Sequence, residues 1–151
     1  IVSGGINNPE SVADHSFRMA LLGAYLSDSA GLDGSKVMRM CLIHDIAESE
    51  IGDLMPEEKS SEEHHRKLED RVARSLFETL PLKSRRAFLK DWSELVKRKT
   101  PESKLVWEID KVEMGLTMKD YVKSGGDSQK LQRFNPTGFL SKDLRALFEE
   151  Y

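Results

Sequence analysis

Apolar residues recur every three to four positions along most of the chain, and this spacing is typical of amphipathic helices. The pattern predicts one helix over about 9–29, a second over about 33–52 and a third from about 60 to the proline at 81. A fourth is expected over about 84–97, a fifth over about 100–125 and a short last helix from about 141. Signals for strands are weak. We therefore expect an all-α bundle of about six helices.

Capping residues indicate where several of these helices begin. Asn8-Pro9-Glu10 and Thr100-Pro101-Glu102 each place a capping side chain before a proline, with an acid in the first turn. Ser60 and Glu63 fit a capping box for the third helix. With 151 residues, 38% of them hydrophobic, the chain has enough apolar material for one core, so we expect a single domain over residues 1–151.

Three of the predicted helices carry an ionisable residue at a position where the apolar spacing calls for core. These residues are His15 on the first helix, His44 on the second and Asp110 on the fifth. A buried carboxylate costs several kcal/mol unless it is paired or bound to a metal. The apolar residues that share these faces are Val12, Met19, Val37, Met40, Val106 and Met114.

Each of the three residues has an ordinary structural explanation when it is taken alone. A lone inward histidine is more often hydrogen-bonded core than a ligand, and Asp110 fits the edge of a solvated face. Taken together, three separate helices each offer a metal ligand. Imidazole and carboxylate ligands suit Mn²⁺, Fe²⁺, Co²⁺, Ni²⁺ or Zn²⁺, with Mg²⁺ as a further option, so we expect one divalent metal.

Two further acids and a lysine lie near His44 in the sequence. Glu48 follows His44 by four residues, and Asp53 comes just after the predicted end of that helix. Acids beside a metal stay ionised and can transfer protons to and from a substrate. Lys59 is placed to reach a phosphate from the loop after Asp53. The alternative for both acids is a solvated surface position, and the neighbouring pair at 64–65 is also expected to be solvated.

The composition limits the location and the partners of the protein. A net charge of −3 gives no broad basic face for nucleic acid, and no apolar stretch is long enough to span a membrane. The lone cysteine, Cys41, lies in an apolar run, so we expect a reducing, cytoplasmic setting. The sequence begins at Ile1 with neither an initiator methionine nor a signal peptide. We therefore expect the natural chain to extend beyond Ile1.

Four sequence segments together resemble the HD-domain superfamily. They are Pro9–Ala20 (PESVADHSFRMA), Ile43–Glu48 (IHDIAE), Ile51–Asp53 (IGD) and Ile109–Lys111 (IDK). The order of a histidine, a His-Asp pair and a later aspartate is the superfamily's signature. The longer context is similar to the 5′-deoxynucleotidase (YfbR-like) subgroup, and the resemblance covers about residues 9–120.

The resemblance implies a helical bundle around one metal and removal of phosphate from deoxynucleoside 5′-monophosphates. It implies that His15, His44, Asp45 and Asp110 hold the metal, with Glu48 and Asp53 as catalytic acids. Arg18 lies one turn after the first histidine, where it would face the phosphate or pair with an acid. Relatives carry an Arg-x-Gly-Trp-like segment that would precede this sequence, and they are often dimers, so a homodimer is an option.

Other functions are compatible with the same metal ligands. A cyclic-nucleotide phosphodiesterase or a hydrolase of guanosine polyphosphates would use the same four residues. A non-catalytic binding module built on an HD bundle is a third alternative. The retention of all four ligand types together with Glu48 and Asp53 favours an enzyme.

Overall fold

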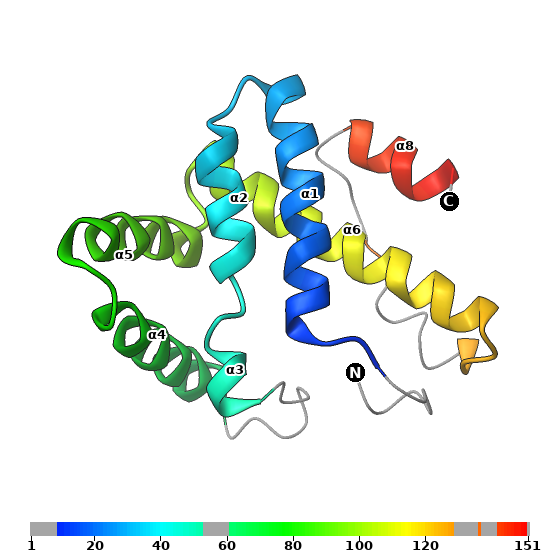
Figure 1. Ribbon diagram of the computed structural model, residues 1–151. Helices are drawn as coiled ribbons and strands as arrows, with labels where there is room; N and C mark the ends of the chain where they lie inside the picture. Colours follow the sequence, from blue (N-terminus) through cyan, green and yellow to red (C-terminus); the bar gives the residue numbers. More distant parts are fainter. Residues whose placement is uncertain (1–8, 53–60, 129–135, 137–141, 151) are drawn as a thin grey trace.

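A computed structural model describes residues 9–52, 61–128, 136 and 142–150, and all regular structure within them is helical (Figure 1). The expected all-α class is therefore confirmed. The helices are α1 (Val12–Ala30), α2 (Gly34–Ile43), α3 (Glu48–Ile51), α4 (Glu62–Glu78), α5 (Leu82–Lys97), α6 (Pro101–Lys123) and α8 (Lys142–Glu150). No helix in these residues has the length and apolar content required to cross a membrane.

Helices α1 and α2 run antiparallel, and α6 crosses behind both of them (Figure 1). Gly31 ends α1 in the left-handed conformation with a φ of 65°, and this turns the chain back into α2. Helices α4 and α5 pair at one side of the bundle, while α8 packs on α6 at the other. The core between α1, α2 and α6 consists of Met19, Leu26, Val37, Met40, Cys41, Val106, Ile109 and Val112.

The capping predictions are confirmed for the helix after Thr100 and wrong for the first helix. Thr100 accepts a hydrogen bond from the Ser103 amide at 3.3 Å and starts α6. The first helix begins at Val12 rather than at Pro9, because Ser11 and Asp14 form a reciprocal capping box. Asn8 lies outside the described residues.

The prediction of one continuous helix over 33–52 is wrong. Helix α2 ends at Ile43, residues 44–47 form turns, and the short α3 follows. Hydrogen bonds to the third preceding residue replace the helical pattern here, as in Glu48 N to Asp45 O at 2.9 Å. His44 and Asp45 therefore lie in the turn between α2 and α3.

The later helices differ from the predictions mainly at their ends. Ser61 caps α4 by accepting from the His64 amide at 3.1 Å, whereas the predicted cap Ser60 lies outside the described residues. Helix α5 begins at Leu82, directly after Pro81 and two residues earlier than predicted. Ser141 and most of the predicted loop over 126–138 also lie outside the described residues.

Gly23 sets how closely α1 approaches α2. A Cβ atom at this position would lie 2.9 Å from Val37 Cγ1 and 3.2 Å from Cys41 Sγ. Both distances are shorter than ordinary van der Waals contact, so a larger side chain would push the two helices apart.

We predict that Gly23→Val lowers the free energy of unfolding by about 2 kcal/mol, because overpacking a close helix contact costs about 1–3 kcal/mol. Ala13→Val is the matched control, since Ala13 lies exposed on the same helix. The control should lose only about 0.6 kcal/mol, the difference in helix propensity. Urea unfolding measures both values, and equal losses in the two variants would contradict the role assigned to Gly23.

Candidate metal centre

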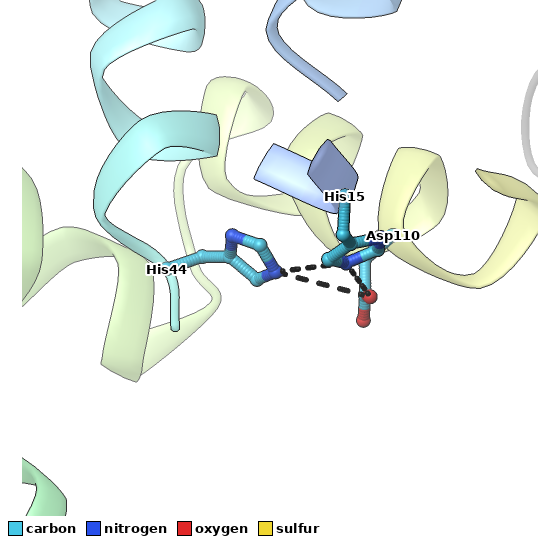
Figure 2. Close-up of side chains that lie close together, drawn as sticks. All are labelled: His15, His44 and Asp110. Carbon is cyan, nitrogen blue, oxygen red and sulfur yellow. Dashed lines mark hydrogen bonds and ion pairs between the residues drawn. The ribbon is translucent and has the colours of Figure 1, made fainter. Parts of the chain in front are cut away.

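Side-chain atoms from α1, α6 and the turn after α2 lie close together at one site. His15 Nε2 lies 3.2 Å from His44 Nε2 and 3.3 Å from Asp110 Oδ1. Asp45 Oδ2 lies 2.9 Å from His44 Nε2 and 4.0 Å from His15 Nε2. Figure 2 shows the rings of His15 and His44 and the Asp110 carboxylate directed toward one another. The structure therefore brings together the four predicted ligands.

The distances between these donor atoms suit a shared divalent cation. Ligand atoms bonded at about 2.1 Å to one metal lie about 3.0–3.4 Å apart when adjacent and about 4.2 Å apart when opposite. The donor pairs that include a histidine nitrogen span 2.9–4.0 Å. Two imidazole nitrogens with carboxylate oxygens are also a set that transition metals accept. His15, His44 and Asp110 in particular could hold a metal ion.

Hydrogen bonds at the far side of each ring turn Nε2 toward the centre. His44 Nδ1 donates to the Cys41 carbonyl oxygen at 2.7 Å. His15 Nδ1 donates to the Glu113 carboxylate. A ring that donates through Nδ1 has its lone pair on Nε2, which is the form that binds a metal.

Glu113 was not identified from the sequence, although it organises one side of the centre. Its side chain is 3% exposed and accepts hydrogen bonds from His15, from Arg18 Nε and from the Thr117 hydroxyl, the last at 3.0 Å. Burial raises the pKa of Glu113, but His15 and Arg18 lower it by more, so the net shift is downward. The signal available in the sequence was its position one turn after Asp110, on the same face of α6.

The acids around the centre favour positive charge there. Burial lowers the pKa of His15, but the hydrogen bonds and charges of Asp110 and Glu113 outweigh it and raise the pKa to about 10. Burial likewise lowers the pKa of His44, and Asp45 and Asp110 raise it above the ordinary value. The negative charges of these acids stabilise either a proton on the imidazole rings or a metal cation between them.

Arg18 pairs with acids in the described residues. Its Nε donates to Glu113 and its Nη2 to Glu10, and Nη2 also lies 3.1 Å from the Thr117 hydroxyl. These contacts match one of the two roles expected for Arg18, which was pairing with an acid. The other expected role, a contact with the phosphate, stays a prediction. The Arg18 side chain is 41% exposed.

A cavity of about 690 Å³ adjoins the centre, with His44, Asp45 and Glu48 on its wall. Glu48 is the first residue of α3 and is half-buried. Asp53 and Lys59, the other residues predicted to act on the substrate, lie outside the described residues.

The prediction that His64 and His65 are both solvated is wrong for one of them. His64 is exposed, but His65 is buried and lines the same cavity as His44. The two side chains point about 100° apart on α4, so one faces solvent and the other faces inward.

The family and the relatives of the chain agree with this geometry. The HD domain family model matches residues 1–151. The 5′-deoxynucleotidase HDDC2 of Dictyostelium discoideum is 34% identical over 143 residues, covering 88% of this chain and 75% of that protein. The 5′-deoxynucleotidase hdd1 of Schizosaccharomyces pombe is 32% identical, covering 90% and 70%.

Solved structures give the same relationship. The PH0347 protein from Pyrococcus horikoshii OT3 superposes with a TM-score of 0.78 at 28% identity, covering 97% of this chain and 84% of that one. A conserved hypothetical protein from Pyrococcus furiosus superposes with a TM-score of 0.75 at 29% identity, with the same coverage. The chain belongs to the HD domain family.

Proposed function

We propose that the protein is a metal-dependent 5′-deoxynucleotidase, which removes phosphate from deoxynucleoside 5′-monophosphates. The observation that carries the proposal is the set of close contacts at the two histidines: His15 Nε2 and His44 Nε2 lie 3.2 Å apart, and each lies within 4.0 Å of a carboxylate oxygen of Asp45 and of Asp110. The names of the relatives in Dictyostelium and fission yeast support this substrate class over cyclic nucleotides and guanosine polyphosphates.

His15, His44, Asp45 and Asp110 would hold one divalent cation, for which Co²⁺, Mn²⁺, Zn²⁺, Fe²⁺, Ni²⁺ and Mg²⁺ are the candidates. Such a cation would neutralise phosphate charge and lower the pKa of a water. The hydrogen bonds from the Nδ1 atoms to Cys41 and Glu113 fix the rings before the cation arrives. Little reorganisation of the site is then needed on binding.

Glu48 and Asp53 would move the protons of the reaction. Glu48 borders the cavity beside His44 and Asp45, where its carboxylate can accept a proton from the attacking water. Asp53 follows Gly52, which ends α3, in the sequence. We assign to Asp53 the role of donating a proton to the leaving 5′ oxygen. Hydrolysis of a phosphate monoester depends mainly on positioning and charge neutralisation, and the bound cation would supply the neutralisation.

A homodimer stays a prediction, as does the cytoplasmic location. Phe17, Leu21 and Tyr25 follow one another at four-residue steps on α1, with exposed fractions of 60%, 57% and 71%. This apolar row is the face that we assign to a contact between two copies.

We expect the protein to release phosphate from deoxynucleoside 5′-monophosphates with Co²⁺ or Mn²⁺ and to lose this activity with a chelator. His44→Ala and Asp110→Ala should each lose bound metal and lower kcat/KM about 1,000-fold, since the metal supplies several kcal/mol to the transition state. A panel of deoxy and ribo 5′-monophosphates, with elemental analysis of each variant, measures this.

Lys111→Ala is the matched control, because Lys111 is exposed on α6 next to Asp110. It should retain both metal and activity. Turnover that survives the chelator and both ligand substitutions would exclude a metal-dependent mechanism.

We predict that Glu113→Gln weakens metal binding about 10- to 100-fold, although Glu113 is not itself a proposed ligand. The substitution keeps the shape of the side chain and removes the charge that orients His15, and loss of such a partner costs affinity on this scale. Competition with a chromogenic chelator measures the dissociation constant.

Glu63→Gln is the control for Glu113→Gln, since it makes the same chemical change at a side chain that is 74% exposed on α4. An unchanged metal dissociation constant in Glu113→Gln would mean that the carboxylate serves folding alone.

A further inference from the structure

The inward face of α4 carries an ionisable pair where apolar side chains would be expected. His65 is 5% exposed, while its neighbours His64 and Arg66 are exposed. Glu69 lies one turn further along the same face, followed by the buried Ala73. The His65 side chain is 6% exposed and that of Glu69 is 29% exposed, so the pair lies at the edge of the core.

The contact within this pair leaves one nitrogen of the ring available. His65 Nε2 lies 2.8 Å from Glu69 Oε1, so Nε2 carries hydrogen and the carboxylate accepts it. No residue in the described part of the chain pairs with Nδ1. Glu69 therefore orients the ring and does not occupy its second nitrogen.

His65 borders the same space as the candidate metal centre. The cavity of about 690 Å³ is lined by His44, Asp45 and Glu48 and also by His65 and Glu69 of α4. Pockets for small ligands occupy about 300–1,000 Å³, and a nucleoside monophosphate falls within that class. A ligand held at the metal centre would extend into a space that His65 lines.

The cavity also has cationic side chains on its wall. Arg66, Lys97 and Arg98 line it together with Trp107. The Arg98 guanidinium lies 3.6 Å from the centroid of the Trp107 ring, which holds it beside the cavity. Acids at the centre attract a cation, and the cations here attract an anion, so the cavity suits an anionic ligand of a bound metal.

We propose that His65 is a further substrate-binding residue, which contacts the phosphate group of the nucleotide through Nδ1 while Glu69 holds its ring. A phosphate offers oxygen acceptors to an Nδ1–H and its own hydroxyl to a bare Nδ1, so both protonation forms of the ring can bind it. This inference rests on the proposed function and adds a contact from α4 to the site formed by α1, α6 and the turn after α2.

Two substitutions at His65 separate a contact through Nδ1 from a structural role through Nε2. The amide of His65→Asn lies near the position of Nδ1, whereas the amide of His65→Gln reaches the position of Nε2 and can still pair with Glu69. A purely structural role predicts that glutamine is the better replacement. A phosphate contact predicts that asparagine is better.

The experiment uses the full chain loaded with Mn²⁺, with inorganic phosphate as the probe. Calorimetry gives the phosphate dissociation constant, steady-state kinetics gives KM for a deoxynucleoside 5′-monophosphate, and elemental analysis gives metal content. We expect His65→Gln to weaken phosphate binding and raise KM about tenfold, the scale of a hydrogen bond to a charged group, at unchanged metal content. His65→Asn should lose about threefold or less. His64→Gln, at the exposed neighbour, should match the unsubstituted protein.

Unchanged phosphate binding in His65→Gln would overturn the inference, and so would better retention by glutamine than by asparagine. Loss of phosphate binding that follows loss of metal would also overturn it, because His65 would then act on the metal site. If no nucleotide is hydrolysed at all, the proposed function fails. The phosphate titration still decides the role of His65 in that case.

Discussion

The crossing of α6 over α1 and α2 is the contact on which the site depends. Ile109 and Val112 are fully buried in this crossing, and they alternate along α6 with Asp110 and Glu113. Apolar burial, at about 25 cal/mol per Å², fixes the position of the helix. The same turns of α6 then deliver two carboxylates to His15, at a desolvation cost that their contacts with His15 and Arg18 offset.

The turn after α2 contributes the other half of the centre. The segment over 44–47 forms turns between α2 and α3, and it places the Asp45 carboxylate 2.9 Å from His44 Nε2. One imidazole and one carboxylate on successive residues thus reach the same point.

The sequence predicted the helices and the ligands better than it predicted their surroundings. His15, His44 and Asp110 could be recognised because a polar residue on an apolar face departs from a strong periodic pattern. Asp45 needed the family resemblance, since the break after Ile43 has no proline or glycine to indicate it. His65 was missed because it lies among charged residues in the sequence, and Glu113 was missed because its sequence position alone does not show that the packing of α6 turns it inward.

Cys41 lies beside Gly23 in the contact between α1 and α2, and its carbonyl oxygen accepts a hydrogen bond from His44. Burial, with a smaller effect of the Asp110 charge, raises the pKa of its thiol to about 12. The thiol therefore stays protonated and does not compete with the imidazoles for a cation, and oxidants and alkylating reagents find no thiolate to attack. Because the single cysteine of the chain is buried, its reaction with a thiol reagent would report an opening of the packing around it.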